Sequence, residues 1–407
     1  MPVRAEDPSS LTTSGPQIAA PAAPTWSDAA VLADAPGLHI ATTQQVLYDT
    51  NVARGDLGVA QLRGITPAEF IYSPAASIDF VHPFGPETLI LKGTAGYDFH
   101  SSNRVLSGER LELNSSVKSQ LGRCNTVVGA GYSRMPSDLE QLNIAVTHND
   151  ISVETASLDA DCGRAVGLDT KVALTEQWAS NSNPQVRIDN FHSFTAVPAI
   201  GYRRPSFGEI ELYGSFQEVS YPDRDLMAGP ASIQDGYRLL GAGLKFDRRL
   251  GARIQATFRI GFVGLRPDIS SVPGFNGLTY GADVSARMTG RIRFSFSFQR
   301  DAAPATWQDV TYAISDTESM QAEYLIGPRF KLDIGLSRTA DDYHGSHLAP
   351  GIDLQHDRID AAFGALSFAM SRRIKFGVEL RHENRAADVF GYNYADTQVG
   401  FTAAAAL

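Results

Sequence analysis

The chain has 407 residues, of which 43% are hydrophobic, and its formal net charge is −10. The mean hydropathy of −0.15 and the lack of any run of about 18 apolar residues exclude a helical membrane protein. The acidic balance argues against general nucleic-acid binding, so we expect no nucleic-acid partner.

The N-terminal segment 1–37 is rich in Pro, Ala and Ser, has little periodicity, and is predicted to be flexible. The segment 38–407 shows no further linker and is predicted to be one domain. No complete signal peptide is visible, but Val3-Arg4-Ala5 before Glu6 resembles the end of a cleavage site. We therefore expect an exported protein whose start lies inside the signal region. The alternative is a cytosolic protein with a disordered tail.

After this segment, stretches of alternating apolar and polar residues recur along the chain. In 291–300 the three phenylalanines share one face with Ile292, while Arg293 and Gln299 share the other. Successive side chains of a strand point to opposite faces, so each stretch is a strand with one apolar and one polar face. The stretches run about ten residues, the length of a membrane-crossing barrel strand. Others occupy 89–100, 209–217, 253–262, 330–337 and 374–383.

Two classes of connection alternate between these strands. Short turns that are basic or contain glycine fall at 83–86, 121–123, 203–205, 248–251, 289–291, 327–329 and 371–373. Longer acidic loops fall at 221–235, 266–276, 301–309, 340–357 and 383–388. Short turns at one rim and long loops at the other are typical of outer-membrane barrels, whereas a sandwich has no reason to sort its loops this way.

The number of alternating segments from His39 onward predicts about eighteen strands, with sixteen as the alternative. In 358–370 the alternation changes phase, which predicts a β-bulge. We expect the N-terminus, the C-terminus and the short turns to be periplasmic and the acidic loops to be outside.

The two cysteines, Cys124 and Cys162, have no metal-binding spacing. They are predicted to lie at the same rim, one hairpin apart, where a disulfide is geometrically possible. Two unpaired thiols are an equally weighted alternative.

The segment 34–58 carries a family resemblance. Its core, 46–52, reads VLYDTNV, and it resembles the opening strand of a family of outer-membrane β-barrel proteins with a Tyr-Asp-x-Asn-Ile/Val signature after a Pro/Ala-rich N-terminus. The segment 89–97, which ends in Gly-Tyr, is also similar. Members are often associated with exopolysaccharide gene clusters, including a group of polysaccharide-biosynthesis operon barrels. The resemblance implies a role in export or surface retention of an exopolysaccharide, with polysaccharide and periplasmic export machinery as partners.

The polar faces of the strands supply the candidate site residues. Charged side chains inside a barrel can line a water-filled channel, compatible with a polysaccharide path, or pair with one another and fill it. Of these two interpretations, the internal salt-bridge network is favoured. The candidate lumen-lining residues are Lys92, Glu209, Glu211, Arg253, Arg259, Arg291, Arg293, Lys375, Glu379, Arg381 and Glu383.

Catalytic and metal chemistry find little support in the residues. The string 131–135 lacks the closing glycine of a Gly-x-Ser-x-Gly motif. The carboxylates of Glu209 and Glu211 lie about 7 Å apart on one strand face, which suits lumen lining as well as glycosidic chemistry. The segment 341–347, DDYHGSH, contains metal-ligand residue types but is better explained as a solvated loop. We expect no enzyme activity, no metal and no cofactor.

The sequence thus predicts an all-β protein, a single antiparallel transmembrane β-barrel in the outer membrane of a Gram-negative bacterium, surrounded by membrane lipid. The first predicted function is exopolysaccharide export or retention. The alternatives are a general diffusion porin for small solutes and a structural or adhesive barrel with a blocked lumen.

Overall fold

The computed structural model describes residues 36–137, 139, 148–163, 166–225, 234–304, 310–345, 354–389 and 391–407. The predicted flexible segment 1–37 lies outside the described residues except for its last two positions. The strands are β1 Gly37–Asp49, β2 Glu69–Phe84, β3 Glu87–His100, β4 Gly108–Leu121, β5 Cys124–Pro136, β6 Asp150–Asp161, β7 Gly167–Asn181, β8 Phe191–Arg204, β9 Gly208–Asp225, β10 Gln234–Leu250, β11 Ile254–Pro267, β12 Phe275–Arg287, β13 Ile292–Pro304, β14 Val310–Ile326, β15 Phe330–Gly345, β16 His356–Ala369, β17 Ile374–Ala387 and β18 Tyr394–Ala406.

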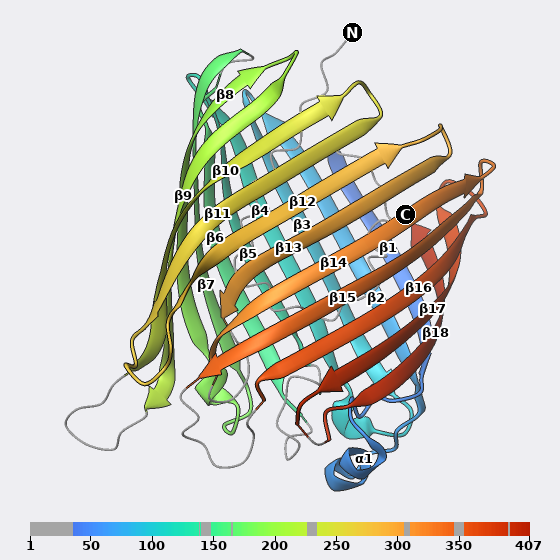
Figure 1. Ribbon diagram of the computed structural model, residues 1–407. Coiled ribbons are helices and arrows are strands. Elements are labelled where there is room, and N and C mark those ends of the chain that lie inside the picture. Colours follow the sequence, from blue (N-terminus) through green and yellow to red (C-terminus); the bar gives the residue numbers. More distant parts are fainter. Residues whose placement is uncertain are drawn as a thin grey trace.

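These strands form one sheet that closes on itself into a tilted barrel (Figure 1). Each strand pairs antiparallel with its neighbours in the chain, and β1 also pairs with β18, from Ala41 opposite Ala406 to Asp49 opposite Gln398. The Leu407 N–H extends this seam by donating to the carbonyl oxygen of Ile40 at 2.9 Å. The sheet contains 18 strands, so the prediction of a closed barrel is confirmed and the sixteen-strand alternative is wrong. Closure leaves no unpaired edge.

The alternation of the sequence corresponds to two surfaces of the wall. On β9 the side chain of Leu212 is 58% exposed, whereas that of its neighbour Glu211 is 1% exposed. Phe294 and Phe296 on β13 are likewise exposed on the outer surface. A continuous outer surface of large apolar side chains is far larger than a water-soluble monomer presents, so the barrel is surrounded by lipid.

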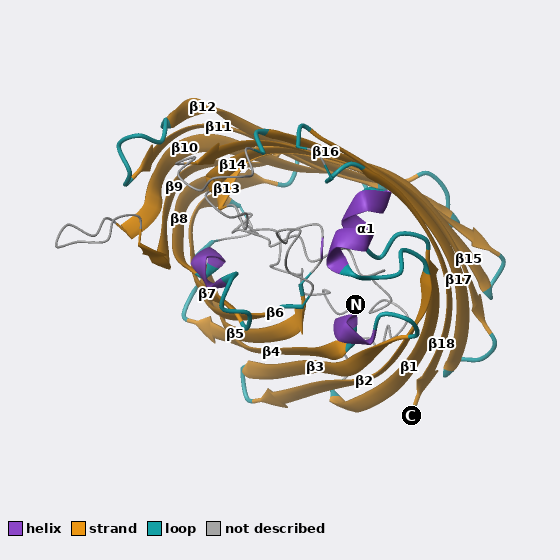
Figure 2. Ribbon diagram, turned by 90° about the horizontal axis from the view of Figure 1, so that it is seen from below, coloured by secondary structure: helices purple, strands orange, loops and turns teal. Residues whose placement is uncertain are grey.

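The two classes of connection lie at opposite rims, as predicted, but 340–345 and 383–387 of the predicted loops belong to β15 and β17. Tight turns join the strand pairs at one rim, and several contain a glycine with positive φ, such as Gly122 (65°) and Gly251 (65°), a conformation that disfavours other residues. The other rim carries the long loops with α1 (Leu57–Arg63), η3 (Arg104–Leu106) and η5 (Arg187–Asp189), which lie within the ring of strands in Figure 2. None of the described helices is long and apolar enough to cross a membrane.

The bulge predicted in 358–370 is wrong. Strand β16 keeps one continuous register with β15 and with β17 along its whole length. The change of phase has another cause: Phe363 faces the inside of the barrel, where its ring covers Gly335 on the neighbouring strand. A Cβ atom at Gly335 would lie only 2.3 Å from that ring. An apolar residue can therefore occupy the polar face because a glycine next to it leaves room for the ring.

A disulfide joins Cys124 and Cys162 at the tight-turn rim. Asn125 lies opposite Asp161 in the β5–β6 ladder, so the next pair outward brings the two cysteines face to face. The sequence separation of 38 residues defines the loop that this bond closes.

We expect non-reducing mass spectrometry to find this bond in the native protein. Cys124→Ser together with Cys162→Ser should lower the free energy of unfolding by about 2–4 kcal/mol, because the unfolded chain gains conformational freedom. Two alkylatable thiols in the unreduced native protein would contradict this prediction.

Candidate functional site

The lumen is the candidate functional site, and most of the predicted residues lie on strand faces that point into it. Lys92 is on β3, Arg259 on β11 and Arg293 on β13. Arg253 and Arg291 lie in tight turns at the rim instead of in strands. The remaining predicted residues are Glu209 and Glu211 on β9 and Lys375, Glu379, Arg381 and Glu383 on β17.

Part of this inner wall is filled by a buried charge network around Lys171 of β7. Its ammonium group contacts the carboxylates of both Glu209 and Glu211. The Arg203 guanidinium donates from Nε to Glu209 at 2.7 Å, and Lys245 Nζ lies 3.6 Å from Glu211 Oε2. Opposite charges on β7 to β10 thus lie in contact with one another, while Glu211 Oε2 is buried without a hydrogen bond among the described residues. Buried carboxylates in such a network stabilise the wall only while all partners are present.

Glu383 of β17 is also paired. Glu383 accepts hydrogen bonds from Arg381 at 2.6 Å and from the Tyr394 hydroxyl at 2.5 Å. On the neighbouring strands Arg385 and Asp357 form a buried ion pair at 2.5 Å. Glu383 and Asp357 are therefore paired within the wall and offer little free charge to a solute.

A hairpin folds into the lumen at the long-loop end. Pairing between β12 and β13 ends where Tyr280 faces Arg300, but pairing between β13 and β14 continues to Pro304 and Tyr312. The residues beyond this point, 301–304 and 310–316, are called the hairpin tip. The tip leaves the wall, and β13 and β14 lie inside the arc of β9 to β12 in Figure 2. The lumen is therefore narrowed by a strand pair that belongs to its own wall.

The hairpin tip packs on the inner face of β9 to β11. The Tyr221 hydroxyl donates to the Thr311 carbonyl at 2.9 Å, and the Tyr312 hydroxyl donates to the Pro273 carbonyl at 2.7 Å. The rings of Tyr237 and Tyr312 meet edge to face at 6.2 Å. This apolar cluster consists of Ala179, Phe191, Val219, Tyr221, Tyr237, Leu239, Val263, Leu265, Ile269, Val272, Ala302, Tyr312 and Ile314.

A buried arginine fastens the tip to the wall. Arg224 of β9 forms ion pairs at 3.0 Å with both Asp189 and Asp235, and its Nη1 donates to the Val310 carbonyl at 2.7 Å. The hydroxyl of Thr311 donates to Asp235 at 3.1 Å. We call these residues the Arg224 latch. It connects η5, β9, β10 and the hairpin tip through charge-assisted hydrogen bonds.

The two tyrosines of the cluster make a matched pair for mutation. The Tyr237 hydroxyl is buried without a hydrogen-bond partner in the described residues, whereas the Tyr221 hydroxyl donates to a carbonyl. We expect Tyr237→Phe to leave stability unchanged or raise it by about 1 kcal/mol, because a desolvated hydroxyl is removed. Tyr221→Phe should cost about 1–2 kcal/mol, because the Thr311 carbonyl loses its donor. Urea unfolding in detergent measures both values, and the reverse order would contradict the assignment.

The long loops at the same end pack on one another. Helix α1 starts at its N-cap Asp56, whose side chain accepts from the Val59 amide, and ends at Gly64 with φ 66°. The buried Arg63 guanidinium donates to the carbonyls of Ala53 and Leu139. These bonds join loops that are distant in sequence into one plug-like layer. Its apolar members are Val52, Ala53, Ala60, Ile65, Leu106, Leu139 and Val186.

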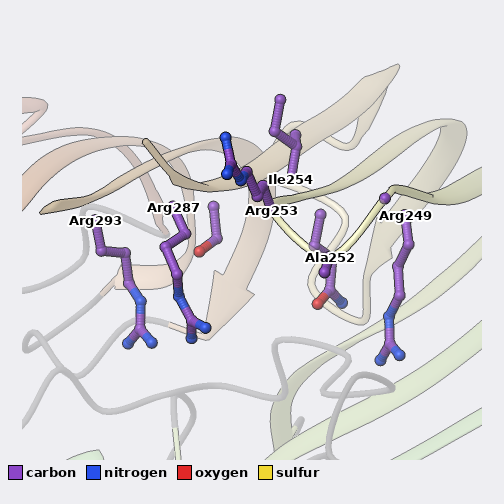
Figure 3. Close-up of a pocket in the computed structure, with 9 residues that line it drawn as sticks. Arg249, Ala252, Arg253, Ile254, Arg287 and Arg293 are labelled. Carbon is purple, nitrogen blue, oxygen red and sulfur yellow. The ribbon is translucent and has the colours of Figure 1, made fainter. Parts of the chain in front are cut away.

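The tight-turn end has a different surface, a basic pocket of about 340 Å³ on β10 to β13. In Figure 3 the side chains of Arg249, Arg287 and Arg293 extend in the same direction, while Ile254 points the opposite way. Figure 3 also shows Arg253 turned away from these three arginines. The pocket is lined by Arg249, Gly251, Ala252, Arg253, Ile254, Gln255, Ser285, Arg287 and Arg293. Arg253 and Arg293 are among the predicted lumen-lining residues, whereas Arg249 and Arg287 are not.

The predicted acidic and histidine-containing segment gives no metal site in the part of the chain that is described. His356 and Asp342 form a single pair at 2.6 Å, and His347 lies outside the described residues. No group of three or more potential ligands occurs among the described residues.

Comparison with known proteins supports the barrel assignment. Residues 215–406, which contain β10 to β18, match the family described as "Putative beta-barrel porin 2". This match confirms the resemblance to outer-membrane barrel proteins. No curated protein matches the sequence significantly. The matched part of the chain is thus similar to β-barrel proteins of porin type.

Several solved structures of outer-membrane proteins align with most of the chain at low similarity. Pseudomonas aeruginosa OccK2 (OpdF) has a TM-score of 0.47 and 12% identity, with 91% of this chain and 97% of that chain covered. Pseudomonas aeruginosa OpdK with vanillate has a TM-score of 0.45 and 12% identity, with 91% and 98% covered. Acinetobacter baumannii OccAB3 has a TM-score of 0.45 and 9% identity, with 91% and 99% covered. At these identities the likeness concerns the fold alone.

Proposed function

We propose that the barrel is a passive channel for small polar solutes. The observation that carries this proposal is the inward-folded hairpin tip. A tip packed inside the lumen restricts passage to small molecules, while the exposed polar side chains at the tight-turn end keep that half of the lumen wet. A barrel that only anchors or adheres has no need for such a polar inner surface.

Conductance across planar lipid bilayers tests this function. We expect purified protein to produce discrete conductance steps, and vesicles containing it to admit monosaccharides faster than larger oligosaccharides. The absence of conductance in correctly folded protein would favour the alternative, a structural or adhesive barrel with a blocked lumen. Equal permeation of small and large sugars would contradict the constricting role of the hairpin tip.

The orientation proposed for the channel places both ends of the strand wall and the tight turns in the periplasm. The start of β1 and the end of β18 lie at the tight-turn rim, and a barrel with short periplasmic turns and long outer loops follows the usual arrangement. Single cysteines introduced at Gly290 and Asn183 provide the test. Only the cysteine at 183 should react with a membrane-impermeant maleimide on intact cells.

Exopolysaccharide export or retention is the second candidate. The basic pocket at the tight-turn rim favours this candidate, because an acidic polysaccharide chain that arrives from the periplasm would contact its arginines first. Deletion of the gene should then reduce surface polysaccharide, with periplasmic export machinery as a partner. Unchanged polysaccharide in a deletion strain would remove this candidate and leave the solute channel untouched.

A further inference from the structure

We propose that the basic pocket is an oxyanion-binding site, at which a solute bearing a carboxylate or phosphate group is held before it crosses the channel. The proposal deepens the solute-channel function proposed above, since it names the class of solute. It rests on the arrangement of charged and polar side chains on four neighbouring strands, β10 to β13.

The first step is the placement of like charges. Arg287 of β12 and Arg293 of β13 lie directly opposite each other in the ladder and on the same inner face. Cross-strand neighbours have Cβ atoms about 4.5–5.5 Å apart, and like charges at this distance destabilise a sheet. Such a pair is stable when an anion lies between the two guanidinium groups.

The second step is the lack of a protein carboxylate to serve as that anion. Among the described residues, no carboxylate oxygen lies within 4.0 Å, the limit for an ion pair, of a guanidinium nitrogen of Arg287 or Arg293. The nearest carboxylate in the ladder, that of Glu323 opposite Arg293, pairs instead with Lys331, at 3.7 Å. Both arginine side chains remain exposed to the lumen. Their charge is available to a solute.

The third step is the set of neutral groups between the arginines. Gln255 of β11 lies opposite Arg249 of β10 on one side and opposite Ser285 of β12 on the other. The Gln255 amide and the Ser285 hydroxyl therefore continue the row of polar groups that begins at Arg249. Arg249 closes the pocket on the other side, as Figure 3 shows. Guanidinium forks bind carboxylate and phosphate oxygens in pairs, and amide and hydroxyl groups donate to the remaining oxygens. The donor set fits an oxyanion and offers no feature for a cation.

Block of chloride current by inorganic phosphate tests the site in the full-length barrel. We expect phosphate to reduce the wild-type current in a saturable manner. The double variant Arg287→Gln, Arg293→Gln should require an about 10- to 100-fold higher phosphate concentration for half block, because two charge-assisted sets of hydrogen bonds are lost. The same measurement with succinate in place of phosphate distinguishes carboxylate solutes from phosphate solutes. The site is supported if either anion blocks the wild type and the double variant loses that block.

The matched control is Arg338→Gln on β15, an exposed arginine on the outer face that pairs with Asp360 at 2.6 Å. It removes one positive charge from the protein outside the lumen and should leave the phosphate concentration for half block unchanged. Equal half-blocking concentrations in the wild type and the double variant overturn the oxyanion site while the channel function stands. If the wild type carries no current, the channel function fails. Calorimetric titration of phosphate into the barrel in detergent then tests the site alone. Equal binding heat in the wild type and the double variant overturns the oxyanion site.

Discussion

Arg224→Met is expected to lower the free energy of unfolding by about 3–5 kcal/mol and to raise single-channel conductance. The guanidinium group is buried between Asp189 and Asp235, with both ion pairs at 3.0 Å. Its removal leaves two buried carboxylates without this counter-charge, which costs far more than the loss of a surface pair. Because Arg224 also donates to the Val310 carbonyl, the same change loosens the hairpin tip.

Arg238→Gln is the control for this prediction. Arg238 lies on β10, the strand next to that of Arg224, and pairs with Glu218 at 2.9 Å, but its side chain is 62% exposed. Exposed ion pairs are screened by water and contribute little, so stability and conductance should hardly change. The unfolding midpoint in urea and the size of conductance steps provide the two readouts. Equal effects of the two substitutions would show that the latch does not hold the tip.

Tyr312→Ala should have the second-largest effect, with a loss of about 3–5 kcal/mol and a larger pore. Tyr312 is 1% exposed, its ring meets that of Tyr237, and its hydroxyl donates to the Pro273 carbonyl. Without this ring the tip loses its main apolar contact with β10. We expect larger conductance steps together with more frequent fluctuations between levels.

The control for this substitution is Tyr324→Ala on the same strand β14, where the tyrosine is 41% exposed on the outer face. It removes the same side chain without touching the tip, and its conductance should match that of the wild type. Combining Tyr312→Ala with Arg224→Met should cost less than the sum of the single losses, because both act on one tip. Strict additivity would argue that the tip and the latch are independent.

The barrel could be predicted from the sequence because its determinants are local. Alternation with a period of two and the punctuation by turns such as Gly122-Arg123 occur within a few residues of each strand. The inward tip could not be predicted in this way. Ile314 and Tyr312 have the same phase as Met320, which is 57% exposed to lipid, yet they are buried inside. A pattern along one strand cannot show that the strand has left the wall.

The candidate site was predictable only in part for a related reason. The alternation placed Glu209 and Glu211 on the inner face, but their partner Lys171 lies some forty residues earlier on β7. Their pairing depends on register across β8, which no single strand encodes. Similarly, the alternation along β12 places Arg287 on the inner face, but its position opposite Arg293 follows only from the β12–β13 register. A search for inner-phase cations next to a tight turn would have found it.

The position of the hairpin tip also bears on the order in which the barrel is assembled. The tip meets the inner face of β9 to β11 most readily while the sheet is still open, before β1 pairs with β18. We infer that the contacts of β13 and β14 with β9 to β11 form first. The pairing of β1 with β18 then forms last, as a late kinetic step. Time-resolved cross-linking during refolding checks this order: a cysteine pair at Thr42 and Ala405 across the seam should react after a pair at Val219 and Ile314, and the opposite order would exclude it.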